Sequence, residues 1–454
     1  MRFLTQIKIH LSLESTYSFI AFILGIILVF LIPPFQTPDE QTHYFRAAGF
    51  IEGSFICEEG RLPISQKRAW FAREMEFLRI AFHPEEKFDL SKIKHFENPD
   101  KEGIARPQLP LCYSLSPAHI APAVAIFVGE SIGMNMLHAF YLARIVDLVI
   151  AVTLTAIAIR IIPFGKHVLM ALGLLPMTIH QFASINYDAF FIPATFLFAA
   201  YILKLLPQKE ELRAKQKILI IMLSIPVAII KVAYLPLLLI PLVLLPKKRR
   251  NRVKFMIFFG ILCGVNIILL ILQGLILGTD VPVPEGIHPS HQLRFVFEHP
   301  FEFFIIVART FYHHIDFYLK SFIGYFGWVD YGLDFATYVL SFFSLLIFIS
   351  LDKTKSVLTR NTRLIFMVAT VATISAVILS MFVIATREGE LIISGIQGRY
   401  FIGVASVGAL ALYTKGFRLW TPKVRKFLTI ALICSLILII YSMVQAVYNR
   451  YYVY

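Results

Sequence analysis

Several stretches of this chain run for about 18 or more residues with few or no charges, and they restrict its fold strongly. Stretches of that length can cross a bilayer as helices, because the hydrocarbon core is about 30 Å thick. Overall, 57% of the residues are hydrophobic and only 16% are charged, whereas a soluble domain carries about 25% charged residues. The sequence therefore predicts an all-α polytopic membrane protein.

The chain has room for about eleven transmembrane helices. They are expected at roughly residues 17–34, 141–162, 167–183, 189–206, 217–230, 232–246, 254–277, 333–350, 364–385, 400–414 and 427–447. We interpret the first as a retained anchor and not as a cleaved signal peptide, because prolines and charges follow it in place of a small-residue cleavage site. The exact count stays open around 110–133 and 217–246, where prolines interrupt the apolar runs.

The basic residues predict how these helices are oriented. The net charge is +14, but the Lys and Arg residues lie in short clusters between apolar segments. This placement is typical of membrane topology and not of a nucleic-acid surface. If segment 110–133 lies on the membrane surface, all the clusters fall on one side, as the positive-inside rule requires. We therefore expect a cytoplasmic N-terminus and a C-terminus outside.

Two large regions then lie on the outer side, residues 35–140 and residues 278–332. The first is polar and charged and is expected to form two or three short helices. The second ends in an aromatic-rich segment, which we expect to be an interfacial helix because aromatic rings favour the headgroup level. The sequence contains no obvious repeat or separate soluble domain, so residues 1–454 are expected to form a single membrane domain.

The four cysteines are Cys57, Cys112, Cys263 and Cys434, and their spacing is not that of a metal site. Cys57 and Cys112 share the first outer region. Two interpretations stay open there: a disulfide, if this region faces an oxidising compartment, or two unpaired thiols.

A charged motif follows the first span directly, in "PPFQTPDEQTHYFRA" at residues 33–47. Thr37 and Glu40 form a capping-box pattern, which predicts a helix that begins here. Such a helix places Asp39 and His43 on one face. Acids in a first helical turn are also favoured by the helix dipole alone, which is the purely structural explanation. The position at the membrane edge favours a functional role.

A second acid lies at the next outer edge, in "LLPMTIHQFASINYDAFF". Asn186 and Asp188 stand where one span ends and the next begins, so helix capping explains them equally well. We expect Asp188 at about the same membrane depth as Asp39.

Basic residues near the same edge supply the opposite charge. Arg144 lies three residues before Asp147, so it either pairs within its helix or binds a lipid phosphate. Lys231 is a lone lysine between two apolar runs, and it must snorkel, pair or bind an anion. Arg399 and Tyr400 follow Gln397 in "SGIQGRYF", where two glycines allow a ligand close to the backbone.

The second outer region adds Trp328 and Asp330 in "GYFGWVDYG". An aromatic ring beside a carboxylate is common in sugar-binding sites, since the CH-rich face of a sugar packs on a ring. An aromatic residue here is equally common as an anchor at the membrane interface.

Together these motifs resemble those of a known family. The segments "PPFQTPDEQTHYFRA", "RPQLPLCYSL", "LARIVDLVIAV", "LLPMTIHQFASINYDAF", "GWVDYG" and "GIQGRYFIGV" are similar, in this order, to motifs of a bacterial membrane-protein family. That family is catalogued as a domain of unknown function and is grouped with the GT-C glycosyltransferases. The resemblance covers most of the chain and implies a GT-C-like fold in the bacterial plasma membrane.

The resemblance also implies an activity. GT-C enzymes transfer a sugar from a polyprenyl-phosphate donor at the outer face of the membrane, and an acid shortly after the first span is part of their site. Asp39 matches that acid, with Glu40 beside it, Asp188 matches a second outer-edge acid, and Arg144 matches the arginine that opens the second span. The acceptor would be an envelope glycan, lipid or protein. Some GT-C enzymes need a divalent metal ion and others do not, and this sequence does not choose.

The chemistry assigns roles to these residues. A sugar phosphate already has a good leaving group, so the reaction needs a base for the acceptor hydroxyl and positive charge near the phosphate. We expect Asp39 to be the base. Glu40, Asp188 and His43 are expected either to orient the acceptor or to hold a divalent ion. The expected phosphate ligands are Arg144, Arg399 and Lys231, and the expected substrate contacts are His43, Asn186, Trp328, Asp330, Gln397 and Tyr400.

Two other classes of function stay open. A transporter or flippase of lipid-linked sugars would also be a polytopic membrane protein, although such proteins often carry internal repeats. A non-catalytic subunit for envelope assembly would explain the large first outer region, but not the acids and arginines expected at one depth.

Overall fold

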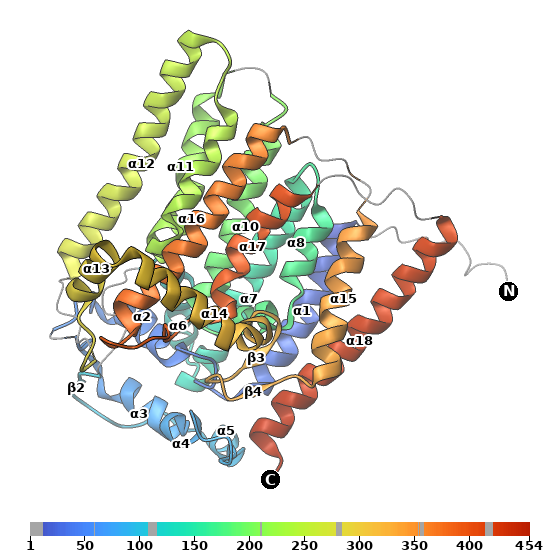
Figure 1. Ribbon diagram of the computed structural model, residues 1–454. Helices are drawn as coiled ribbons and strands as arrows, with labels where there is room; N and C mark the ends of the chain where they lie inside the picture. The colour runs from blue at the N-terminus through green and yellow to red at the C-terminus, as the bar shows by residue number, and fades with distance from the viewer. Residues whose placement is uncertain are drawn as a thin grey trace.

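The computed structural model describes residues 12–58, 60–107, 116–208, 211–277, 284–352, 354, 358–413 and 421–454. Long helices run side by side through these parts of the chain, and shorter elements gather at one end of the bundle (Figure 1). The strands that are described form two small two-stranded antiparallel sheets. The described residues are therefore mostly helical, as predicted, with two short sheets that the prediction did not include.

The helices of the bundle itself include a 3-10 helix, η2. They are α1 (Leu13–Leu31), α7 (Met136–Ile161), α8 (Lys166–Gly173), α9 (Pro176–Phe182), α10 (Tyr187–Leu205), α11 (Ala214–Ile230), η2 (Val232–Leu244), α12 (Arg249–Leu277), α15 (Phe335–Leu351), α16 (Arg360–Ala385), α17 (Ile402–Leu412) and α18 (Pro422–Tyr452).

The remaining elements are short, apart from α14. They are α2 (Glu40–Glu52), β1 (Ile64–Ser65), α3 (Gln66–Glu74), α4 (Phe77–Ile80), α5 (Ser91–Lys94), β2 (Ile104–Ala105), η1 (Pro117–His119), α6 (Ile120–Ser131), α13 (Pro289–Glu298), α14 (Pro300–Ile323), β3 (Tyr325–Phe326), β4 (Tyr331–Gly332) and η3 (Gly398–Phe401).

The expected number of spans was too high. Among the described residues, six helices are long and apolar enough to cross a membrane, namely α1, α7, α10, α12, α16 and α18. The other five expected spans are shorter. A 17-residue helix such as α11 or α15 reaches only about 26 Å at 1.5 Å per residue, less than the apolar thickness of a bilayer.

Proline accounts for two of the short segments. The expected span at 167–183 is divided into α8 and α9, and Pro176 opens the second of these helices. Segment 232–244 forms a 3-10 helix and contains Pro236 and Pro241. Proline lacks the backbone N–H that an α-helix needs, and these prolines lie where one helix gives way to the next or where a 3-10 helix replaces the α-helix.

The two ends of the bundle differ in composition. The ends of α7, α10, η2, α15 and α17 and the starts of α8, α11, α12, α16 and α18, near which the described Lys and Arg residues gather, lie at one end of the bundle (Figure 1). The elements α2 to α6, α13 and α14 lie at the other, which we call the loop end. This separation is the one that the charge pattern predicts.

Segment 110–133 does not cross the bundle. Its described part forms η1 and α6, and α6 has only 12 residues, which is too short for a span. Residues 110–115 lie outside the described residues. Helix α6 packs closely against α7, where Gly129 lies against Ala139. The expectation that this segment lies outside the transmembrane set is confirmed.

Helix α14 corresponds to the expected interfacial helix. It crosses the bundle near the loop end instead of running along it (Figure 1). One face packs through Ile306 and Tyr318, whereas Phe301, Phe304 and Tyr312 are exposed. The helix is therefore amphipathic, as the aromatic-rich sequence indicates.

Apolar packing joins the loop end to the bundle. The main core extends from Tyr17 on α1 to Tyr451 on α18. A second, smaller cluster around Ile306 and Phe382 joins α13, α14 and α16. Cys57 is disulfide-bonded, whereas Cys263 and Cys434 are free. The question of Cys112 falls outside the described residues.

Candidate functional site

The segment between α1 and α2 places two neighbouring acids in different surroundings. Asp39 occupies the N-cap position of α2 with a left-handed backbone (φ 65°, ψ 0°), and the helix begins at Glu40. Aspartate is one of the few non-glycine residues that adopt this conformation readily. The predicted Thr37 cap is wrong, since its hydroxyl makes no hydrogen bond within the described part of the chain.

Glu40 turns into the protein and pairs with Arg144. The Arg144 Nε and Nη2 atoms donate to the two carboxylate oxygens of Glu40 at 2.7 and 2.6 Å. Both side chains are fully buried. The backbone N–H groups of Phe35 and Ile185 also donate to the Glu40 carboxylate. The pair therefore ties the start of α2 to α7 and to the residues just before α10.

Arg144 has no N–H group left for a phosphate. Its remaining donors bind the carbonyl oxygens of Val29, Ile32 and Pro33 at the end of α1. The expected roles of Arg144 in phosphate binding and of Glu40 in catalysis do not fit these surroundings. Both residues act instead as a buried structural clamp, because a buried charge must have its partners satisfied.

Asp39 faces the other way and meets Arg399. The Arg399 Nη2 atom lies 3.1 Å from an Asp39 carboxylate oxygen, although the two residues are 360 positions apart. The Asp39 side chain is 40% exposed, whereas that of Arg399 is only 4% exposed. Two glutamines hold the guanidinium, since Gln397 accepts from Nε at 2.7 Å and Gln181 accepts from Nη1 at 3.3 Å.

Gln181 connects this contact to the second acid. Its Oε1 atom also accepts from Asn186 Nδ2 at 2.8 Å, and Asn186 Nδ2 reaches the Pro38 carbonyl beside Asp39 at 3.4 Å. Asn186 caps α10 by accepting from the backbone N–H of Asp188. The capping explanation of Asn186 is therefore confirmed. Gln181 was not predicted, although a glutamine inside an apolar segment was a usable signal.

Asp188 pairs with Lys231 inside an aromatic cage. The Lys231 Nζ atom lies 2.6 Å from Asp188 Oδ1. It also lies 4.8 Å, 4.9 Å and 5.2 Å from the ring centroids of Tyr187, Phe191 and Tyr400. An ammonium over aromatic faces is stabilised by about 0.5–2 kcal/mol per contact. Lys231 was expected to snorkel, to pair or to bind an anion, and the structure shows that it pairs. Its side chain is 13% exposed.

These residues form one polar cluster from distant parts of the chain. It draws on the start of α2, on α9, on the start of α10, on the α11–η2 junction and on η3. Its members are Asp39, Gln181, Asn186, Asp188, Lys231, Gln397, Arg399 and Tyr400. Of the residues that the sequence selected, the structure thus brings seven together.

His43 lies beneath the cluster and not at its surface. Its Nδ1 atom is 2.9 Å from His119 Nε2, and its ring meets Tyr187 edge-on. Burial lowers the pKa of His43 to about 3, together with a smaller contribution from the positive charges of Arg399 and Lys231. His43 is therefore neutral at pH 7 and does not contact the exposed side of Asp39.

Trp328 and Asp330 are placed elsewhere. Asp330 pairs with Arg450 near the end of α18 at 2.7 Å, and both side chains are buried. Trp328 packs on Phe77 and Phe82 in the first outer region. The expected substrate contacts of these two residues do not fit this placement. They fasten the β3–β4 hairpin to α18 and to the loop end instead.

The polar cluster contains two carboxylates, and each faces its own cation. Asp39 pairs with Arg399, and Asp188 pairs with Lys231. Within the described residues, no group of three or more His, Cys, Asp or Glu side chains is arranged to hold a metal ion. The arrangement offers an exposed carboxylate beside a guanidinium that is held rigidly from behind.

Comparison with known proteins gives one match. Residues 22–407 match a family described as "Predicted membrane protein (DUF2142)". No curated protein and no solved structure matches the chain. The resemblance to a membrane-protein family of unknown function is confirmed, and the grouping with GT-C glycosyltransferases stays a prediction.

Proposed function

Because the chain belongs to the DUF2142 family of predicted membrane proteins, we propose a function from its polar cluster. We infer that the protein is a membrane glycosyltransferase, which moves a sugar from a polyprenyl-phosphate donor to a cell-envelope acceptor. The lipid tail of the donor would lie along the apolar helices, and its phosphate and sugar would reach the polar cluster at the loop end.

The Asp39–Arg399 contact carries this proposal. It pairs a partly exposed carboxylate with a guanidinium that Gln181 and Gln397 already orient. A transferase that uses a sugar phosphate needs a base for the acceptor hydroxyl and positive charge for the leaving phosphate within one site. The left-handed backbone at Asp39 adds support, because such conformations often occur at functional positions.

The reaction follows from these two groups. The acceptor oxygen forms a bond to C1 of the donor sugar, and the bond between C1 and the phosphate oxygen breaks. The electron pair of that bond stays on the phosphate, and the proton of the acceptor hydroxyl passes to the Asp39 carboxylate. Arg399 stabilises the charge on the departing phosphate, because its guanidinium is preorganised and poorly solvated.

Lys231 and Asp188 complete the proposed site. Lys231 adds a second positive charge, and its aromatic cage keeps the ammonium at the inner side of the cluster. Asp188 and Asn186 hold Lys231 and Gln181 in place. We assign Asp188 a positioning role, since its carboxylate is only 2% exposed.

Two observations support an outer location in a bacterial plasma membrane. Helix α2, whose N-cap residue Asp39 belongs to the polar cluster, lies at the loop end, away from the helix ends near which the described basic residues gather (Figure 1). The positive-inside rule assigns such basic residues to the cytoplasm. Cys57 of the first loop is disulfide-bonded, and disulfides persist in oxidising compartments such as the cell exterior.

Asp39→Asn tests the proposal directly. Asparagine tolerates the left-handed backbone as aspartate does, so the change removes the charge and leaves the fold intact. Removal of a general base lowers the rate by about 10²–10⁴-fold. The measurement is sugar transfer from radiolabelled polyprenyl-phosphate sugars to envelope acceptors, with purified protein in proteoliposomes.

The matched control is Asp100→Asn in the first outer region. Asp100 is exposed, so transfer should stay within about twofold of the wild type. A folded Asp39→Asn protein that transfers sugar at the wild-type rate would contradict the proposal. If Asp39→Asn still moves lipid-linked sugar across vesicles while Lys231→Met does not, the flippase alternative is correct. If envelope assembly tolerates both changes, the protein is a structural subunit.

A further inference from the structure

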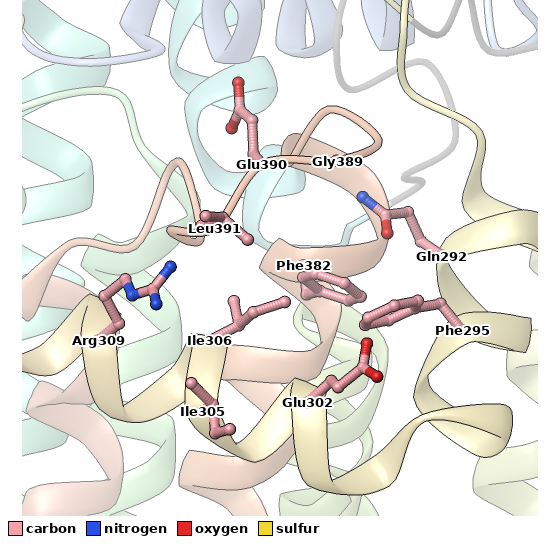
Figure 2. Close-up of a pocket in the computed structure, with 10 residues that line it drawn as sticks. All are labelled: Gln292, Phe295, Glu302, Ile305, Ile306, Arg309, Phe382, Gly389, Glu390 and Leu391. Atoms are coloured by element: carbon pink, nitrogen blue, oxygen red, sulfur yellow. The ribbon is translucent and has the colours of Figure 1, made fainter.

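A cavity of about 260 Å³ lies at the loop end, apart from the polar cluster. Figure 2 shows its walls, which come from α13, from α14, from the end of α16 and from the loop that follows α16. At about 30 Å³ per molecule, it has room for roughly nine waters, or for one ligand the size of a sugar ring. The function proposed above does not use it.

The cavity has an apolar floor made of two rings and aliphatic side chains. The Phe295 and Phe382 rings lie 6.0 Å apart between centroids, and Figure 2 shows them next to each other on one side. Ile305, Ile306 and Leu391 complete the floor. Such a surface suits the CH-rich face of a ligand ring, because flat apolar surfaces pack well on aromatic side chains.

Arg309 is the polar group that most needs a partner. Its side chain is half-buried and makes no ion pair or hydrogen bond with any described residue. In Figure 2 its guanidinium points toward the loop that carries Leu391. Five N–H donors are therefore left for a ligand or water.

The cavity also supplies hydrogen-bond acceptors. Glu302 and Glu390 carry carboxylates, and Gln292 uses its Nε2 atom on the carbonyls of Thr386 and Arg387. The side-chain oxygen of Gln292 accepts no hydrogen bond within the described part of the chain. Donors and acceptors thus surround one apolar floor, which is how sites for uncharged polar ligands are built.

The charge of the lining selects among ligands. Two acids line the cavity beside one guanidinium, Arg309: Glu302 stands next to Phe295, and the Glu390 carboxylate turns outward and accepts from Ser394 Oγ (Figure 2). A phosphate or other anion would contact Arg309 but would be repelled by the negative charge of Glu302. A neutral polyhydroxylated ring has no such conflict, since its hydroxyls both donate and accept and its CH face covers the rings.

The cavity is connected to the polar cluster by one loop. Residues 386–398 begin beside the cavity, include Gln397 and end directly before Arg399. Helix α14 holds this loop at two points, since Thr310 Oγ1 accepts from Ile393 N–H and Ser321 Oγ accepts from Gly398 N–H. These two points are 11 helical residues apart, or roughly 16 Å at 1.5 Å per residue.

We propose that this cavity is a saccharide subsite, which binds a neutral sugar unit of the acceptor glycan at Arg309, Gln292 and the Phe295–Phe382 pair. That the bound sugar belongs to an acceptor rests on the proposed function, whereas sugar binding by the cavity does not. The two points where α14 holds the loop, roughly 16 Å apart along the helix, indicate an elongated acceptor that spans several sugar units. Helix α14 would then guide the acceptor chain toward Asp39.

Saturation-transfer-difference NMR tests the subsite without any need for catalysis. The full-length protein in nanodiscs is mixed with neutral gluco-, manno- and galacto-oligosaccharides and, separately, with oligouronates as anionic probes. Neutral oligosaccharides should give a signal that falls at least about fivefold in Arg309→Met, because the hydrogen bonds of the guanidinium are lost. Leu391→Trp, which fills the cavity from the loop, should have the same effect.

Arg294→Met is the matched control. Arg294 lies on α13 and is mostly exposed, where it pairs with Glu298 outside the cavity. Its variant should keep the wild-type signal. Three results would overturn the subsite: no signal from neutral sugars, a wild-type signal in both cavity variants, or a stronger signal from oligouronates. In the transfer assay, Arg309→Met should raise the acceptor KM about tenfold at unchanged kcat. Normal sugar binding with no transfer activity would sink the proposed function and leave the subsite standing.

Discussion

Replacing Arg144 by methionine separates a structural role from a catalytic one. Arg144 is fully buried and directs all five N–H groups to Glu40 and to three carbonyls at the end of α1. Methionine keeps most of the side-chain length but removes the charge. Glu40 would then remain as a buried carboxylate with only the N–H groups of Phe35 and Ile185.

The magnitude follows from the two bonds between Arg144 and Glu40. Hydrogen bonds between charged groups contribute about 1.5–3 kcal/mol each. Loss of one partner of a buried ion pair costs about 3–5 kcal/mol, since the other charge is left uncompensated. We therefore expect Arg144→Met to lower the free energy of unfolding by about 3–5 kcal/mol. The double variant Arg144→Met/Glu40→Gln should lose less than the sum of the two single changes.

The assay is equilibrium unfolding of the purified protein in mixed micelles, followed by circular dichroism. Arg160→Met provides the control on the same helix, because Arg160 is exposed and should change stability by no more than about 0.5 kcal/mol. Transfer activity per folded molecule should stay near the wild-type value in Arg144→Met. An Arg144→Met protein of wild-type stability that has lost donor binding would refute the structural interpretation and restore the phosphate role.

Two further predictions concern acidity and close packing near the cluster. The buried His43 has a pKa of about 3 in the folded protein, so only the unfolded chain binds this proton between pH 6.5 and 3, and the contribution of His43 alone should lower stability by about 2 kcal/mol from pH 6.5 to pH 5. Unfolding measured at the two pH values should show a smaller fall in His43→Asn; an equal fall would contradict the assignment. In Gly398→Ala, the added methyl would collide with backbone atoms of Tyr318 and Phe322 on α14, which should cost about 1–3 kcal/mol and weaken transfer. Gly264→Ala lies inside α12 where the space is open, so it should leave transfer unchanged and should not lower the free energy of unfolding, because alanine favours a helix over glycine by about 1 kcal/mol.

The membrane character of this protein follows from its sequence. Its long apolar runs match the thickness of a bilayer, and in lipid a helix satisfies all its backbone hydrogen bonds internally. The separation of the basic residues from the loop end follows in the same way, since the positions of Lys and Arg between the apolar runs are given directly by the sequence. The cap at Asn186 was also visible, because capping depends on residues only two or three positions apart. Local chemistry thus decided the class of protein, its polar end and some helix boundaries.

The hydropathy of the sequence did not show which apolar segments form full spans. Segments 167–183 and 232–246 are as hydrophobic as their neighbours. The first is divided into two helices at Pro176, and the second forms a 3-10 helix that contains Pro236 and Pro241. Hydropathy sums the side chains of a window, whereas a span also needs an unbroken backbone of sufficient rise.

The roles of Asp39 and Glu40 were settled only by tertiary structure. The two acids are adjacent in sequence and looked equivalent, but successive residues at the start of a helix point in different directions. Glu40 pairs with Arg144, which is 104 positions away, and both side chains are buried in this ion pair. Asp39 meets Arg399, which is 360 positions away, and keeps one side open to a ligand. A sequence states which charges exist, and only the packing of distant helices decides which of them remain free to react.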